Sequence, residues 1–207
     1  MKKFQVLRQV LRAGLLGLFI LLGGTLSAQA DEMRAGVSLH DGEFFEDLVF
    51  GGKHGKEQSM SLTAEYIWDT PDWLDWAWGA RPYVGGTLNL EAETSHGGGG
   101  VVWRGAFWNN FYADFSFGLV VHSGHVRTPN PIDATTPEEV DIRHARKAAE
   151  IEFGSRVLFR ENFALGYRFN DKWAGEITYE HLSHGQLLGG PENEGANSVG
   201  VRLAHRF

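Results

Sequence analysis

Residues 173–183 read WAGEITYEHLS, and the alternation of side chains in this stretch decides the fold class. Apolar residues at odd positions and polar residues at even positions give two faces, one with Trp173, Ile177 and Tyr179 and one with Glu176, Thr178 and Glu180. Successive side chains of a β-strand point to opposite faces of its sheet. The stretch therefore predicts a β-strand with one apolar face and one polar face.

The same alternation recurs along the chain. We expect eight strands, near 33–41, 58–69, 79–91, 99–109, 111–122, 153–169, 173–184 and 198–207. A tilted strand of about ten residues is long enough to cross a bilayer. The links after the second, fourth and sixth strands are short, and those after the others are mostly longer. Short turns on one side and longer loops on the other are typical of outer-membrane barrels.

Charged residues on the polar faces favour a membrane barrel over a soluble β-sandwich, which would alternate in the same way. We place them in an enclosed interior where opposite charges pair: Arg156, Arg160, Arg168, Glu176, Glu180, Arg202 and Arg206. Eight strands leave an interior filled by side chains, so no pore is expected. The prediction is an all-β, eight-stranded, antiparallel, up-and-down outer-membrane β-barrel with a filled interior.

Aromatic residues gather near the short turns, as expected for an interfacial girdle. The girdle would consist of Trp68, Trp73, Trp76, Trp78, Trp108, Phe111, Tyr112, Phe169, Trp173 and Phe207. A last strand that ends in Phe207 also resembles the C-terminal signature of bacterial outer-membrane barrels.

The N-terminal 30 residues resemble a secretory signal peptide. A basic start precedes an apolar run over 13–22, and Ala28–Gln29–Ala30 forms an A-x-A cleavage site. The alternative is a retained membrane helix, for which the run is short. We expect a signal peptide over 1–30 and one barrel domain over 31–207. The net charge of −7 disfavours nucleic-acid binding, and the lack of cysteine excludes disulfides and thiolate metal sites.

The loop over 123–152 contains a helix signal. Thr136 is a candidate N-cap, followed by Pro137 and by Glu139 three positions after the cap. We expect a short helix over 137–149. Its basic cluster, formed by Arg143, His144, Arg146 and Lys147, predicts contact with anionic lipid headgroups. The alternative is an ordinary solvated helix face.

His181 and Ser183 share the odd-numbered, lipid-facing side of residues 173–183. Polar groups on such a face are costly and usually have a role. A serine nucleophile with a histidine base needs a third group that orients the ring. If Phe169 pairs with Trp173 across the tight turn, Glu161 lies opposite His181. If Ser183 pairs with Asn197 across the last loop, Asn197 lies on that face too.

The motif resembles one known family. His181–Leu182–Ser183 is followed by Pro191, Asn193, Gly195, Asn197–Ser198 and a final strand. This pattern is similar to that of the lipid A 3-O-deacylase (PagL) family, and the segments 111–124 and 155–169 look similar as well. The resemblance implies an eight-stranded barrel in the outer membrane of a Gram-negative bacterium. It implies hydrolysis of the ester-linked 3-hydroxyacyl chain at position 3 of lipid A.

The resemblance also assigns roles to residues. It implies Ser183 as the nucleophile, His181 as the base and Asn197 at the position of the family's acidic third member. An asparagine can orient the ring but carries no charge, so Glu161, Glu192 or Glu194 is the alternative source of charge. His184–Gly185 replaces the family's Asn-Ala. The oxyanion donors then fall on Asn193 and on the backbone around His184 and Gly195.

No metal or cofactor is implied. The expected partners are lipid A and other outer-membrane lipids, with a homodimer left open and nucleic acid excluded. Two other functions remain open at this point. One is a non-catalytic structural or adhesion barrel that acts through loops 42–57 and 123–152, and the other is a different outer-membrane lipid acyl hydrolase or acyltransferase.

Overall fold

The computed structural model describes residues 30–41 and 55–207. The expected signal peptide over 1–30 lies outside the described residues except for Ala30, and so does most of the loop 42–57. Among the described residues, no helix is both long and apolar enough to cross a bilayer.

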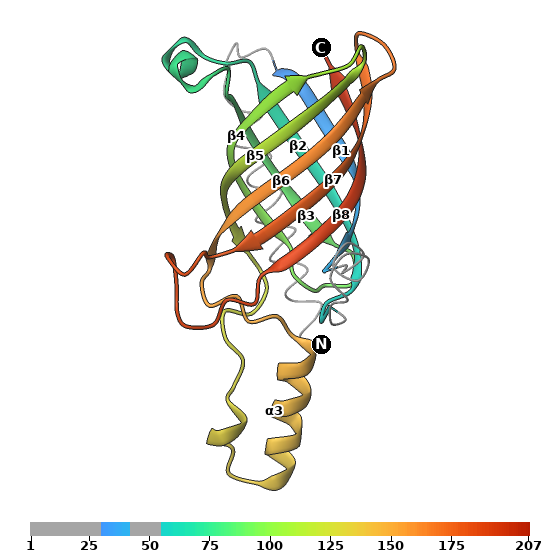
Figure 1. The fold of residues 1–207 in the computed structure, drawn as a ribbon. Coiled ribbons are helices and arrows are strands. Elements are labelled where there is room, and N and C mark those ends of the chain that lie inside the picture. Colours follow the sequence, from blue (N-terminus) through green and yellow to red (C-terminus); the bar gives the residue numbers. More distant parts are fainter. Residues whose placement is uncertain (1–29, 42–54) are drawn as a thin grey trace, which may run out of the picture.

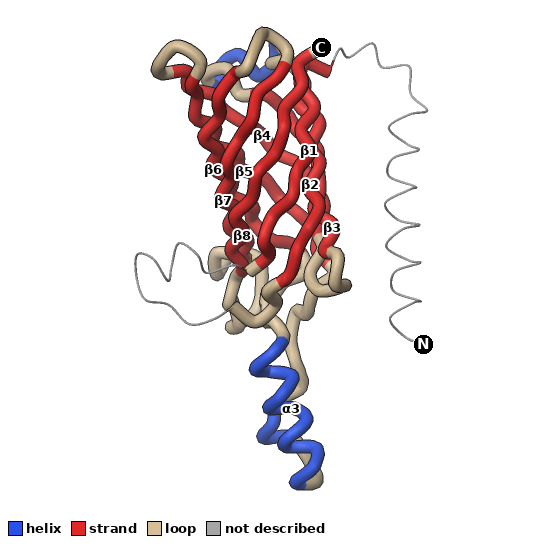
Figure 2. Tube along the Cα trace, turned by 90° about the vertical axis from the view of Figure 1, so that its right-hand side faces the viewer, coloured by secondary structure: helices blue, strands red, loops and turns tan. Residues whose placement is uncertain are grey.

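Eight antiparallel strands form a closed barrel, as predicted (Figures 1 and 2). They are β1 (Ala30–His40), β2 (Ser59–Trp68), β3 (Arg81–Asn89), β4 (His96–Ala106), β5 (Phe111–His122), β6 (Val157–Arg168), β7 (Trp173–Ser183) and β8 (Ala196–Arg206). Each strand pairs with the next along the chain, and β8 pairs with β1 to close the sheet. The barrel therefore has no unpaired strand edge.

The two ends of the barrel differ. We call the end with the links after β2, β4 and β6 the turn end, and the opposite end the loop end. The expected difference in link length is wrong at two links. The link after β2 contains a 3₁₀ helix, η1 (Asp72–Ala77), whose Leu74 and Ala77 are buried against the barrel. The link after β3 is a compact turn, because the side-chain oxygen of Asn89 accepts hydrogen bonds from the backbone N–H groups of Glu91 and Glu93.

The barrel interior holds a network of paired charges. Arg34 lies 2.5 Å from both Glu32 and Asp114, and Arg160 lies 2.5 Å from Glu180. Three further pairs are Arg160–Glu65, Arg202–Glu65 and Arg202–Glu176. The carboxylates of Glu32, Asp114 and Glu176 are close enough to hold a metal, but arginines lie among them. This network fills the interior, as the sequence predicts.

Two of the charges placed inside by the sequence lie elsewhere. Arg156 precedes β6 and is exposed, with its guanidinium donating to the backbone oxygens of His122 and Gly124. Arg206 is exposed at the turn end of β8. Both residues fall where a strand begins or ends, so strand alternation does not hold them inside the barrel.

The aromatic girdle is confirmed with one exception. Exposed rings surround the turn end, formed by Trp73, Trp76, Trp78, Trp108, Phe111, Phe169, Trp173 and Phe207. Trp68 is half-buried. Tyr112 does not belong to the girdle, because its even position turns it inward. Its hydroxyl donates to Glu176 over 2.6 Å, and the Arg104 guanidinium lies 3.8 Å from its ring centre.

Folded loop segments cover the loop end. Ile151 and Phe153 pack with Val120, Leu158, Leu182 and Ala196 in a buried apolar cluster. The predicted sixth strand therefore begins later than expected, at Val157. The predicted helix is present as α3 (Pro137–Ala149), which projects away from the barrel with a second short helix, η2 (Pro131–Asp133) (Figure 1). Thr136 caps α3 by accepting from the backbone N–H of Glu139.

Candidate functional site

His181 and Ser183 lie on the outward face of β7, close to the loop end. The residues that alternate with them, Glu180 and Leu182, are buried inside the barrel, while His181 and Ser183 are half-buried on the outside. The strand directions place Ser183 at the end from which α3 projects (Figure 1). The outward orientation deduced from alternation is therefore confirmed.

The neighbouring strands bring two polar residues level with His181. The register pairs Glu161 of β6 with His181, as the tight turn at Phe169 and Trp173 predicts. On the other side, His181 pairs with Asn197 of β8. The pairing of Ser183 with Asn197 is thus wrong by two residues. A shift of two keeps Asn197 on the same face and places it directly beside the ring.

The histidine ring is bound through one nitrogen. Nδ1 of His181 lies 2.7 Å from Oδ1 of Asn197. The hydroxyl of Tyr179 donates to the same oxygen over 2.9 Å. An amide oxygen only accepts hydrogen bonds, so this arrangement places a proton on Nδ1 and leaves Nε2 as the basic nitrogen.

Tyr179 is a site residue that the sequence reasoning missed. The alternation places Tyr179 on the lipid-facing side, where the sequence analysis counts it only as an apolar side chain and assigns its hydroxyl no role. The signal was its position two residues before His181, which puts both side chains on one face. Only the register with β8 shows that Asn197 lies within reach of both.

The residues around Ser183 fix a tight turn after β7. Gly185 and Gln186 both have positive φ, as does Gly195 just before β8. A Cβ at Gly195 would lie 3.3 Å from Cε1 of His181 and 3.7 Å from Cβ of Ser183. Glycine at this position therefore leaves room beside the pair. Within the described chain, the Ser183 hydroxyl makes no hydrogen bond, and catalytic hydrogen bonds often tighten only with substrate bound.

His184 is fully buried and forms hydrogen bonds within the loop after β7 instead of facing lipid. Its Nε2 lies 2.6 Å from the carbonyl oxygen of Glu192. Its backbone N–H donates to Oδ1 of Asn193 over 3.0 Å. The backbone N–H of His184, which the sequence suggested as an oxyanion donor, is therefore already bound. The Oδ1 of Asn193 is the acceptor in this bond, so the NH₂ group is the part of Asn193 that can donate to an oxyanion.

The two glutamates of the last loop are engaged elsewhere. Glu194 lies 2.6 Å from Nζ of Lys56 and also accepts from the backbone N–H of Glu152. Glu192 lies 2.9 Å from the Arg127 guanidinium. These contacts tie the loop after β7 to the loops after β1 and β5. They hold the loop that follows Ser183, and neither carboxylate pairs with His181.

The basic cluster on α3 is paired within its own loop. Arg143 contacts Glu139, Arg146 contacts Glu150 and Lys147 contacts Glu152. His144 is exposed. Contact of Arg143, Arg146 and Lys147 with lipid headgroups stays a prediction.

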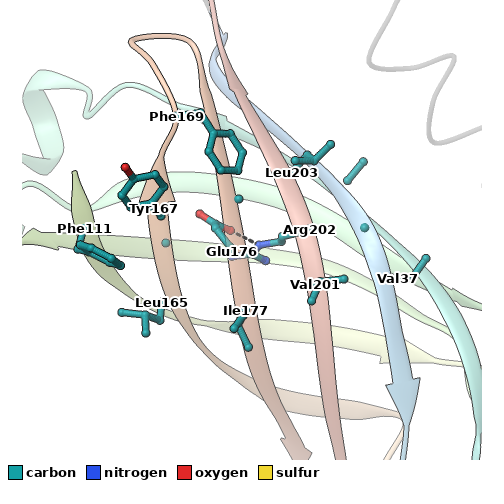
Figure 3. Close-up of a pocket in the computed structure, with 14 residues that line it drawn as sticks. Val37, Phe111, Leu165, Tyr167, Phe169, Glu176, Ile177, Val201, Arg202 and Leu203 are labelled. Carbon is teal, nitrogen blue, oxygen red and sulfur yellow. Dashed lines mark hydrogen bonds and ion pairs between the residues drawn. The ribbon is translucent and has the colours of Figure 1, made fainter.

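An apolar hollow lies on the same outward wall, nearer the turn end. Its lining includes Tyr167, Ile177 and Leu203, which Figure 3 labels. Ile177 is six residues from Ser183, which is roughly 20 Å along a strand. The hollow is lined by apolar atoms and is separate from the polar cluster at His181, so we regard it as lipid-facing surface.

A closed barrel with an apolar outward wall and an aromatic turn end defines an integral outer-membrane β-barrel. The sequence model of the lipid A 3-O-deacylase (PagL) family matches residues 58–206, and the chain belongs to this family. The family places the chain among the ester hydrolases of the outer membrane.

One solved structure supports the fold. The crystal structure of the outer membrane enzyme PagL is 15% identical with a TM-score of 0.53, and the match covers 85% of this chain and 99% of that one. The crystal structure of Neisserial surface protein A (NspA) is 9% identical with a TM-score of 0.49, covering 85% of this chain and 95% of that one. No curated protein matches the sequence significantly.

Proposed function

We propose that this protein hydrolyses the ester-linked 3-hydroxyacyl chain at position 3 of lipid A, with Ser183 as nucleophile, His181 as base and Asn197 as the residue that orients His181. Family membership supports the reaction. The hydrogen bond between His181 and Asn197 on the lipid-facing wall, with Ser183 two residues along the same face, carries the assignment of residues.

The reaction would proceed in two halves. Nε2 of His181 takes the proton of the Ser183 hydroxyl as Oγ attacks the ester carbonyl carbon. The tetrahedral intermediate collapses, and His181 returns the proton to the sugar oxygen, which leaves as a hydroxyl. A water molecule, deprotonated by His181, then attacks the acyl group on Ser183. This step releases the fatty acid and restores the serine.

Asn197 would act through the ring. Its oxygen keeps the proton on Nδ1, so Nε2 faces the nucleophile unprotonated, as in other sites that use an asparagine third member. Tyr179 fixes the orientation of the amide by donating to that same oxygen. We assign oxyanion stabilisation to the NH₂ group of Asn193 and to the backbone N–H of Gly185 or Gly195.

The position of the site suits a lipid substrate. Lipid A lies in the outer leaflet, and its acyl esters are presented to the barrel wall at the level of the headgroup boundary. A pair on the outward face near the loop end can reach such an ester without a closed pocket.

Mass spectrometry of lipid A from cells that express the protein tests the function. We expect loss of the position-3 acyl chain with the natural sequence and no loss with Ser183→Ala, with both barrels folded and heat-modifiable. Unchanged lipid A with a properly inserted wild-type barrel would refute the function. Transfer of the acyl chain to another lipid, in place of a free fatty acid, would indicate an acyltransferase.

A further inference from the structure

Glu161 is a carboxylate on the lipid-facing wall whose Oε2 has no hydrogen-bond partner among the described residues. It lies directly opposite His181 in the register of β6 and β7. Its Oε2 is buried and has no hydrogen-bond partner within residues 30–41 and 55–207. An ionisable group at membrane depth is costly and indicates a functional site whose partner should be identified.

The surroundings of Glu161 explain why the oxygen is unpaired. On β5 its neighbour in the register is Phe117, and the Phe117 and Phe159 rings stack with centres 5.6 Å apart. The other side is occupied by His181, whose Nδ1 is already bound to Asn197. None of the described ion pairs joins Glu161 to a cation. Oε2 of Glu161 thus lies beside aromatic rings, and no donor among the described residues binds it.

Glu161 is close enough to the reaction centre to contact a substrate. Directly opposed residues in an antiparallel sheet have Cβ atoms about 5 Å apart, and diagonal neighbours lie about 7–8 Å apart. His181 is the direct neighbour and Ser183 the diagonal one. A glutamate side chain covers part of the diagonal distance, and an ester bound at Ser183 covers the rest, so the carboxylate can contact a substrate group next to that ester.

We propose that Glu161 is a substrate-binding residue that accepts a hydrogen bond from a donor next to the scissile ester. This inference rests on the proposed function. Two groups of the substrate have this chemistry: the hydroxyl of the 3-hydroxyacyl chain and the amide N–H of the neighbouring acyl chain on the sugar. A substrate that lacks the donor leaves the buried acceptor of Glu161 unpaired. Such a substrate binds poorly, and the enzyme therefore selects for substrates that carry the donor.

The test uses the purified full barrel in detergent micelles and synthetic diacyl glucosamine 1-phosphates. One substrate carries a 3-hydroxyacyl chain at position 3, a second lacks that hydroxyl, and a third replaces the amide at position 2 by an ester. We expect the wild type to cleave the complete substrate roughly tenfold or more faster in kcat/KM than the one that lacks the relevant donor. Which of the two deletions matters identifies the donor.

Variants of Glu161 decide the assignment. Glu161→Leu should lose the preference, whereas Glu161→Gln, which keeps a carbonyl acceptor, should retain part of it. Met60→Gln is the matched control, because Met60 is outward-facing on the distant strand β2 and its replacement adds an amide to the lipid-facing wall away from the site.

Three results would overturn the inference. One is a preference that Glu161→Leu leaves intact. Another is an equal loss of rate on all three substrates with a shifted pH profile, because Glu161 would then act on the charge of His181. A third is a wild type without preference between the substrates. A wild type that cleaves none of them overturns the proposed function itself.

Discussion

His181 and Asn197 face each other directly across β7 and β8, with Nδ1 of the ring 2.7 Å from Oδ1 of the amide. This contact makes Asn197 the third member of the proposed site. Asn197→Ala should lower kcat by about two orders of magnitude, because the ring loses its orientation and its tautomer. Asn197→Asp should retain activity, because a carboxylate also accepts from Nδ1–H.

Kinetics in detergent micelles measure the effect, with Val199→Ala, two residues further along the same face, as control. Full activity of Asn197→Ala would remove Asn197 from the site.

Tyr179 should contribute indirectly. Tyr179→Phe removes the hydroxyl that donates to Asn197 and keeps the ring in the wall. The loss of one neutral hydrogen bond predicts a decrease of about three- to tenfold in kcat with little change in stability. A decrease as large as that of Asn197→Ala would show that the hydroxyl does more than hold the amide.

The interior charge network should dominate the stability of the barrel. Arg202 is buried and pairs with both Glu65 and Glu176. Arg202→Met leaves two buried carboxylates short of a partner, and we expect the free energy of unfolding to fall by about 3–5 kcal/mol. Urea unfolding in micelles measures this change. Arg206→Met, at the exposed end of the same strand, should change it by about 0.5 kcal/mol or less.

Acid should loosen the loop end through Glu57. Burial by itself raises the pKa of Glu57, but His40 and the backbone N–H groups of Thr94 and Ile151 bind the carboxylate and lower its pKa below the ordinary 4.5. A lowered pKa in the folded state means that Glu57 stabilises the loops at neutral pH. This stabilisation is lost as the pH falls below 4.5 and through the folded-state pKa.

Hydrogen exchange of the Thr94 and Ile151 amides at neutral and acid pH measures this effect. The protection factors of both amides, measured relative to the intrinsic exchange rate at each pH, should fall in acid, and in Glu57→Gln they should be low at both pH values. Protection that does not depend on pH would contradict the assignment.

The projecting helix should be dispensable for the barrel. No residue of α3 is buried, and the side chains of its Arg146–Glu150 ion pair are partly exposed. Replacing 130–149 by a short linker should leave the melting temperature and the rate in micelles unchanged. A lower rate on vesicles of anionic lipid alone would support headgroup contact by Arg143, Arg146 and Lys147. Equal rates of the two proteins on vesicles would contradict it.

The alternation along the chain is sufficient to predict the barrel and the direction of its side chains. The period of two along residues 173–183 turns Glu180 and Leu182 inward and His181 and Ser183 toward lipid, because a strand has no other way to arrange successive side chains. The capping residues Thr136 and Glu139 likewise located α3, because a helix start is a local event. Alternation failed near strand ends, at Arg156 and Arg206, because the local pattern does not fix where a strand stops. Tyr112 follows the alternation and faces inward, and its placement in the girdle rested on its residue type alone.

Which residues meet across neighbouring strands depends on the folded barrel. The partner of His181 depends on the register between β7 and β8, and a loop of unknown conformation separates these strands, so counting residues missed the pairing by two. In the structure, Glu192 pairs with Arg127 and Glu194 pairs with Lys56, whereas Asn197 binds the ring of His181. Within residues 30–41 and 55–207, Oε2 of Glu161 is also left without a hydrogen-bond partner, because contacts across strands depend on distance in space and not on spacing along the chain.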